Sequence, residues 1–184
     1  MNHLAVFCGS QFGTDPAYAT AAADLGLELA RRGVTLVYGG GRVGLMGVVA
    51  AACVEAGGAV VGVIPEFLAA KEIAFTAATE LHVVATMHQR KAIMADRADA
   101  VAVLPGGFGT MDELFEILTW AQLGLHAKPV VLLNVNGFFD PLIAWVDHLT
   151  KEGFVQARHR NLVLTADGVP DLFARLDRRG PDVR

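Results

Sequence analysis

The sequence has no long apolar stretch, although 53% of its 184 residues are hydrophobic. A membrane-spanning helix needs about 20 consecutive apolar residues, and every apolar run here is interrupted before that length. The first ten residues also lack a basic leader, and they reach Gly9 before a hydrophobic signal segment would be complete. We therefore expect neither membrane insertion nor export, and no membrane partner.

Cysteine and positive charge are both scarce. The two cysteines, Cys8 and Cys53, have no CxxC spacing and form no disulfide framework, so we interpret them as buried small hydrophobes in a reducing cytoplasm. The 15 basic residues are outnumbered by 19 acidic ones, which gives a formal net charge of -4. A protein that holds duplex nucleic acid carries a broad cationic field, so we expect no nucleic acid polymer as a partner.

Short apolar runs alternate along the chain with segments long enough to be crossover helices. This alternation is typical of a parallel sheet covered on both faces. We predict a single domain over residues 1–184, an α/β fold with a Rossmann-like, doubly wound parallel sheet. The predicted strands are residues 4–8, 34–38, 59–64, 81–84, 100–104 and 130–135, with a weaker one at 161–165.

Several helix ends are marked in the sequence. Asp15 is placed as an N-cap before Pro16, and Gly33 as a C-terminal stop. Thr86 and Gln89 have the spacing of a capping box, which predicts a helix from Met87 to Ala98. Further helices are predicted from Asp140 toward Thr150 and over residues 170–178, and residues 177–184 are expected to be a frayed tail.

The most informative segment is residues 104–113, Leu-Pro-Gly-Gly-Phe-Gly-Thr-Met-Asp-Glu. It lies between a predicted strand and a predicted helix, so Gly106, Gly107 and Gly109 fall where backbone amides can bind a phosphate at a helix N-terminus. Thr110 could cap that helix and donate its hydroxyl to a phosphate oxygen. Phe108 is as suited to covering the loop as to touching a ligand.

A second glycine loop, residues 38–44, also follows a strand and precedes a helix. Gly39, Gly41 and Gly44 formally satisfy the GxGxxG dinucleotide fingerprint, which keeps an NAD-dependent oxidoreductase open. The loop follows the second strand instead of the first, however, and the acidic residue that the fingerprint requires would be Glu66, which follows Pro65 at the start of a loop. Plain turn glycines and another kind of nucleotide contact, through Gly40 and Gly41, are the other two interpretations.

The loop after the first strand contains Ser10, and its position predicts that all three loops converge at one edge of the sheet. A carboxylate on the helix after residues 104–109 would then lie near the bound phosphate. Asp112, Glu113 and Glu116 are the carboxylates available there, although each alone is explained by the helix dipole. Met111, Leu114, Phe115 and Leu118 recur at helical spacing and predict the face turned to the sheet, which leaves the carboxylates on the flanks.

Arg90 and Lys91 form a cationic pair near a predicted helix N-terminus, where the helix dipole disfavours positive charge. Their placement is better explained if an anionic ligand or an acidic helix lies opposite, although a solvated helix face is the simple alternative. His88 and His126 lack metal-ligand spacing and are interpreted as surface or capping residues, so no metal is expected.

These motifs together resemble the Lonely Guy (LOG) family of cytokinin riboside 5'-monophosphate phosphoribohydrolases, whose members are often labelled lysine decarboxylases. Residues 105–113 have the form PGGxGTxxE, and Met87-His-Gln-Arg-Lys91 stands upstream at the family spacing. The resemblance covers residues 4 to about 155. It implies hydrolysis of the N-glycosidic bond of an N6-substituted adenosine 5'-monophosphate, with AMP left open as a second substrate, and a homodimeric enzyme without a cofactor.

By motif position, the resemblance implies that Arg90 and Glu113 are the catalytic pair. The remaining residues implied or interpreted as nucleotide contacts are Ser10, Gly40, Gly41, Glu72, Lys91, Gly106, Gly107, Phe108, Gly109, Thr110, Met111, Asp112 and Thr119. Asp112 stands where the family often has Glu, and the segment 67–79 matches less clearly, so the preference for a base is not specified.

Three alternatives to this hydrolase remain to be compared. A non-catalytic nucleotide carrier would keep the glycine loops but would not require Arg90 and Glu113 together. A lysine decarboxylase would need a pyridoxal-phosphate lysine, and no such context surrounds any of the lysines in the sequence. An oxidoreductase would need to bind NAD(P)H.

The predicted helices offer apolar surface beyond a single face, at Met87, Ile93, Met94, Trp120 and Leu123. This surface is in keeping with a dimer and equally with core packing.

Overall fold

The computed structural model describes residues 1–72 and 74–177, without the side chains of Ala70 and Glu72. Seven parallel strands form one sheet in the order β4-β3-β2-β1-β5-β6-β7. The strands are β1 (His3–Phe7), β2 (Thr35–Tyr38), β3 (Val60–Pro65), β4 (Glu80–Val84), β5 (Ala100–Val103), β6 (Val130–Leu133) and β7 (Val163–Ala166). Every predicted strand is present, shifted by at most two residues at either end.

Eight α-helices and one short 3-10 turn connect the strands in the described part of the chain. They are α1 (Ala17–Arg32), α2 (Gly44–Glu55), α3 (Glu66–Glu72), α4 (Met87–Arg97), α5 (Phe108–Gln122), η1 (Val135–Gly137), α6 (Asp140–Lys151), α7 (Ala157–Arg160) and α8 (Val169–Leu176). None of these helices is both long and apolar enough to cross a membrane.

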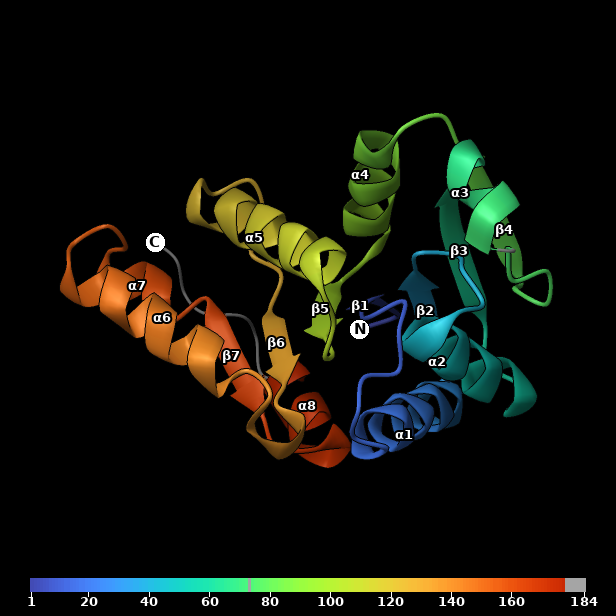
Figure 1. The fold of residues 1–184 in the computed structure, drawn as a ribbon, viewed down its shortest axis with the longest axis horizontal. Coiled ribbons are helices and arrows are strands. Elements are labelled where there is room, and N and C mark those ends of the chain that lie inside the picture. The colour runs from blue at the N-terminus through green and yellow to red at the C-terminus, as the bar shows by residue number, and fades with distance from the viewer. Residues whose placement is uncertain (73, 178–184) are drawn as a thin grey trace.

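The helices cover both faces of the sheet, as Figure 1 shows, with α1, α2 and α8 on one side and α4, α5 and α6 on the other. Each face has its own hydrophobic cluster: Leu25 and Leu29 of α1 pack in the first, and Met94 and Leu114 in the second. The predicted doubly wound α/β fold is therefore confirmed. The strand order reverses between β1 and β5, so the loops after these two strands border the crevice where open α/β sheets bind ligands.

The predicted helix ends are largely confirmed. The Asp15 carboxylate accepts a hydrogen bond from the Ala17 amide at 2.9 Å, and Gly33 ends α1 in the left-handed conformation with φ of 65°. The α6 helix begins at Asp140 as predicted, and α8 begins one residue earlier than predicted. Of the expected tail, residues 178–184 lie outside the described residues, but Asp177 is fixed by an ion pair with Arg32 at 3.2 Å.

The predicted sheet-facing side of α5 is partly wrong. Leu114 is buried as expected, but Phe115 is only partly buried and packs edge-on against Trp145 of α6, with ring centroids 5.7 Å apart. Because neighbouring helices cover the flanks of α5, its buried stripe is Thr110, Glu113, Leu114, Ile117 and Ala121. Glu113 therefore lies on the buried face, not on a solvated flank.

Candidate active site

The α5 helix begins at the glycine loop and offers free amides there. Gly107 is the N-cap in an extended conformation, and the first helical hydrogen bond runs from the Met111 amide to the Gly107 carbonyl at 3.0 Å. The amides before Met111 are those that a helix leaves without an intrahelical partner, and they favour an anion. The prediction that Thr110 caps this helix is wrong, because Gly107 already begins it and Thr110 falls in its first turn.

Gly106 lets the Thr110 side chain pack into the loop. A Cβ atom on Gly106 would lie 2.1 Å from the Thr110 hydroxyl and 2.9 Å from the Gly9 amide nitrogen. Thr110 is buried as a result. The loops after β1 and β5 are thus held against each other, and the Gly9 amide donates to the Pro105 carbonyl at 3.0 Å.

The α4 helix carries Arg90 to the same edge of the sheet. Its N-terminus has the predicted cap: Thr86 Oγ1 accepts from the Gln89 amide at 3.2 Å, and Gln89 Oε1 accepts from the Ala85 amide at 3.0 Å. Arg90 is 6% exposed and donates from Nη2 to the Gly39 carbonyl at 3.1 Å. Its Nε is buried and has no hydrogen-bond partner among the described residues. One donor of this guanidinium is therefore left unsatisfied by the protein.

Glu113 and Arg90 line one cavity of about 260 Å³ at the carboxyl end of the sheet. Glu113 is 9% exposed, and no ion pair shorter than 4 Å joins it to Arg90 in the described part of the chain. Burial raises the pKa of Glu113 to about 7, against the lowering effect of Arg90; Asp112 raises it further and Lys91 lowers it. A carboxyl group with this pKa exists in both protonation states near neutral pH.

Seven of the predicted site residues line this cavity: Ser10, Arg90, Gly107, Phe108, Gly109, Thr110 and Glu113. Phe108 is 98% exposed, so it borders the opening and packs against nothing. A second hollow of about 230 Å³ adjoins at Ser10 and Gly107, and Gly106 lines that one.

The structure does not bring the other predicted residues to the cavity. Gly40 and Gly41 do not line the cavity, and Met111 packs against the hydrophobic cluster of its face. Thr119 is exposed farther along α5, where its hydroxyl donates to the Phe115 carbonyl. Lys91 and Asp112 form an ion pair with each other. The side chain of Glu72 lies outside the described residues. A nucleotide contact by these residues stays a prediction.

The residues that form the rest of the cavity wall were not among the predicted site residues. It consists of Val6, Cys8, Gly39, Met46, Leu68 and Met87. Cys8 ends one predicted strand and Gly39 directly follows another, so their position at the carboxyl edge of the sheet could have been predicted. Leu68 lies in α3, for which the sequence gives no motif. Cys8 is a free, buried cysteine, and burial raises the pKa of its thiol.

The second glycine loop packs against the first loop. The amides of Leu45 and Met46, at the start of α2, donate to the Gly9 carbonyl at 3.0 and 3.4 Å. A Cβ atom on Gly44 would lie 2.3 Å from the Ser10 carbonyl carbon, and Gly44 has φ of 56°. The start of α2 is therefore occupied by protein, and Glu66 is the first residue of α3, not part of a loop. Neither feature favours the dinucleotide fingerprint.

The two histidines considered in the sequence, His88 and His126, lie away from the cavity. His88 is exposed, and the ring of His126 lies 2.9 Å from the Ile117 carbonyl at the end of α5, so both have the surface and capping positions expected. Among residues 1–72 and 74–177, no group of three or more His, Cys, Asp or Glu side chains could hold a metal ion.

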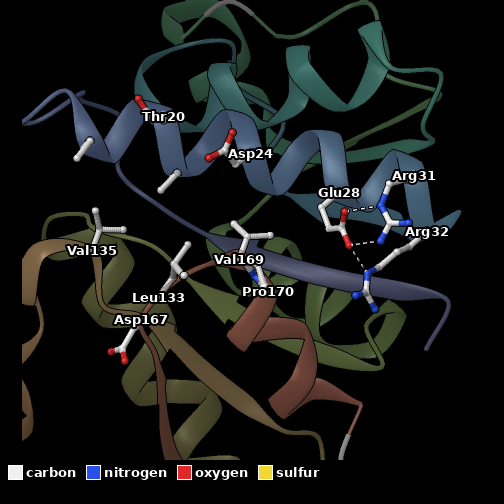
Figure 2. A pocket seen from close by; sticks show the side chains of 13 residues that line it. Thr20, Asp24, Glu28, Arg31, Arg32, Leu133, Val135, Asp167, Val169 and Pro170 are labelled. Carbon is white, nitrogen blue, oxygen red and sulfur yellow. Dashed lines mark hydrogen bonds and ion pairs between the residues drawn. The ribbon is translucent and has the colours of Figure 1, made fainter.

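A larger hollow, about 850 Å³, lies elsewhere, between α1 and the segment that enters α8 (Figure 2). Glu28 faces it and pairs with both Arg31 and Arg32 at 2.6 Å, so its carboxylate is already engaged within α1. No convergent catalytic side chains line it, and size alone does not make it the reactive site.

Fold and site together define a Rossmann-like α/β protein with a glycine-rich helix N-terminus beside a buried arginine and a buried glutamate. A family model described as "Possible lysine decarboxylase" matches residues 46–176. The chain is 49% identical to probable cytokinin riboside 5'-monophosphate phosphoribohydrolase LOGL9 of Oryza sativa subsp. japonica, over 97% of this chain and 78% of that one. It is 46% identical to cytokinin riboside 5'-monophosphate phosphoribohydrolase LOG4 of Arabidopsis thaliana, over 97% and 83%. The chain belongs to this LOG family, as its motifs predicted.

Solved structures support the fold independently. The molybdenum cofactor carrier protein from Chlamydomonas reinhardtii superposes with a TM-score of 0.74 at 24% identity, over 96% of both chains. A molybdenum cofactor binding protein from Rippkaea orientalis gives a TM-score of 0.68, also at 24% identity. At this identity the likeness shows a shared fold and nothing about the ligand.

Proposed function

We propose that this protein hydrolyses the N-glycosidic bond of N6-substituted adenosine 5'-monophosphates, giving the free base and ribose 5-phosphate. The observation that carries the proposal is the buried carboxyl group of Glu113, which shares one cavity with Arg90 and the free amides of α5. The names of the LOG relatives supply the reaction. AMP, which shares the phosphate, ribose and adenine, is a second substrate to be tested.

In this proposal the 5'-phosphate binds the amides at the start of α5. Glycine at positions 107 and 109 lets an anion approach these amides, since a Cβ atom at either position would meet no other atom within 4 Å. Fixing the phosphate also fixes the ribose over Glu113, so binding energy remote from the scissile bond contributes to lowering the barrier.

Glu113 is the proposed catalytic carboxylate. Cleavage of an N-glycosidic bond develops positive charge on the ribose ring, and a carboxylate beside the ring can stabilise that charge or deprotonate the attacking water. Burial strengthens either effect, because the cavity is less polar than water. Arg90 lines the same cavity, and its guanidinium group donates to the ribose or phosphate. No step of this scheme requires a cofactor.

The decisive assay incubates the protein with AMP and with isopentenyladenosine 5'-monophosphate and measures released base and ribose 5-phosphate. We expect Glu113→Gln to lower kcat by about 10³-fold or more, because it removes the negative charge and the base together. In the wild type, kcat is expected to fall below pH 7 as Glu113 becomes protonated. Full activity of the Gln variant would overturn the proposal, and nucleotide binding without turnover in the wild type would favour the carrier interpretation.

We also propose that the enzyme is a cytoplasmic homodimer. Met94 does not belong to the dimer surface suggested by the sequence, because it is only 1% exposed and packs in the hydrophobic cluster between α4 and the sheet. Leu123 is 66% exposed, and Leu125, Trp145 and Phe154 add exposed apolar surface. Light scattering coupled to size-exclusion chromatography would measure the oligomeric state, and a monomer at micromolar concentration would contradict this part of the proposal.

A further inference from the structure

Lys91 makes two ion pairs that join α4 to α5 beside the proposed catalytic pair. Its Nζ lies 2.9 Å from Asp112 Oδ2 and 3.1 Å from Glu116 Oε2. The Lys91 side chain is 11% exposed, and that of Glu116 is 25% exposed. Ion pairs between fully exposed side chains contribute little to stability. A mostly buried lysine with two acidic partners on another helix holds the two helices together more strongly.

Two residues of these ion pairs are sequence neighbours of the proposed catalytic residues. Lys91 is the neighbour of Arg90, and Asp112 is the neighbour of Glu113. Lys91, Glu113 and Glu116 also border a gap of about 10 Å³ behind the main cavity. A gap of this size holds about one water molecule, so no nucleotide enters it. Glu113 therefore has the substrate cavity on one side and the Lys91 ion pairs on the other.

We propose that Lys91 is a positioning residue, whose ammonium group binds Asp112 and Glu116 and so holds Glu113 in place relative to Arg90. This role rests on the proposed function of Glu113. It differs from the nucleotide contact that motif position implies for Lys91, because in this structure both acidic partners lie on α5 and Lys91 does not line the substrate cavity.

The charges around Glu113 give the proposal a second consequence. Arg90 and Lys91 face it from α4, Asp112 and Glu116 flank it on α5, and the Cys8 thiol lies near it from the end of β1. Without Lys91, the negative charges of Asp112 and Glu116 at Glu113 would be offset by Arg90 but no longer by Lys91. The protonated form of Glu113 would then persist to higher pH, and the enzyme would need a higher pH to become active.

The test compares Lys91→Met, Lys91→Arg and the triple variant Lys91→Met, Asp112→Asn, Glu116→Gln. We expect Lys91→Met to lower kcat about 10-fold at pH 7 with KM changed less than about twofold, since the binding cavity is intact. The pKa of Glu113, followed by NMR of its ¹³C-labelled carboxyl group, should rise by about half a unit or more. Lys91→Arg should restore both values, and the triple variant should restore the pKa of Glu113 but not kcat.

A matched control is Arg97→Met, which removes the 2.9 Å ion pair with Glu80 from the other end of α4. It should change neither kcat nor the titration of Glu113. A Lys91→Met variant with raised KM, unchanged kcat and an unchanged Glu113 titration would overturn the positioning role and favour nucleotide contact. If the wild type shows no turnover, the proposed function fails, but the NMR titration still decides whether Lys91 controls the charge of Glu113.

Discussion

At the scale of single residues, Gly39 shows how backbone and catalytic side chain depend on each other. Arg90 donates to its carbonyl, and a Cβ atom built on Gly39 would lie 1.8 Å from Arg90 Nη2. The φ angle of Gly39 is not positive, so alanine meets no backbone strain there. The glycine is thus required by the guanidinium beside it and not by the turn.

We predict that Gly39→Ala folds but loses activity. The colliding atom is the end of a flexible side chain, which can move away, so the melting temperature should change little. Displacing the guanidinium by an ångström or more should lower kcat about 10²-fold. Gly168→Ala is the control, because its Cβ would meet only Pro170 Cδ at 3.8 Å, outside the site. If Gly39→Ala and Gly168→Ala have equal kcat values, Arg90 does not need its present position.

The burial of Arg90 and Glu113 could not be predicted from single residues. Their importance was predicted from the motifs, but their burial was not, because an acidic residue in the first turns of a helix is already explained by the helix dipole. Burial depends on how α4 and α5 pack across β1, and no local pattern encodes that packing. An acidic helix opposite Lys91 was one of the explanations that the sequence offered for its placement, and α5 is that helix, but the two partners could not be named, since Lys91 and Asp112 are 21 residues apart.

At the scale of elements, the start of α4 determines where Arg90 lies. Arg90 is in the first turn, and the Thr86 hydroxyl and the Gln89 amide group fix that turn. The sequence predicted this cap because the signal lies within four residues. The start of α5 was predicted three residues too late, because glycine in an extended conformation can begin a helix without any side-chain cap.

We predict that Thr86→Ala lowers the free energy of unfolding by about 1 kcal/mol, the usual cost of losing an N-cap. Urea denaturation at pH 7 would measure it. Thr20→Ala is the matched control, because Thr20 lies in the exposed first turn of α1 and bonds only the Pro16 carbonyl, at 3.3 Å. It should cost less than about 0.5 kcal/mol. Equal losses in the two variants would mean that the Thr86 cap does not stabilise α4.

At the scale of the whole molecule, the sheet topology assembles the site. The β1 and β5 strands lie side by side and run parallel, with Leu4 paired to Ala100, although these two residues are 96 positions apart in the sequence. The alternation of apolar runs predicted the sheet, and the switch point between β1 and β5 then places the loops of both strands together. The shape of the cavity wall could not be predicted, since Leu68 comes from α3 beyond the far side of β2.

The raised pKa of Glu113 has a consequence for the stability of the whole protein. The unfolded chain titrates this carboxyl group near 4.5, whereas the folded protein titrates it at about 7. The folded state therefore binds the proton more tightly, so the contribution of Glu113 to stability is fully present below pH 4.5 and is lost as the pH rises through 7. The charged form that the reaction needs is the form that folding disfavours.

We predict that Glu113→Gln stabilises the protein at pH 8 by up to about 3 kcal/mol while removing its activity, because a shift of one pKa unit corresponds to about 1.4 kcal/mol. Near pH 4.5 the two proteins should have similar free energies of unfolding, because the wild-type carboxyl group is then protonated in the folded state. Urea denaturation of both proteins from pH 4.5 to 8 would measure the difference. A gap that stays constant with pH would mean that Glu113 is not the buried acid that titrates near neutrality, and would remove the physical reason for assigning it the reaction.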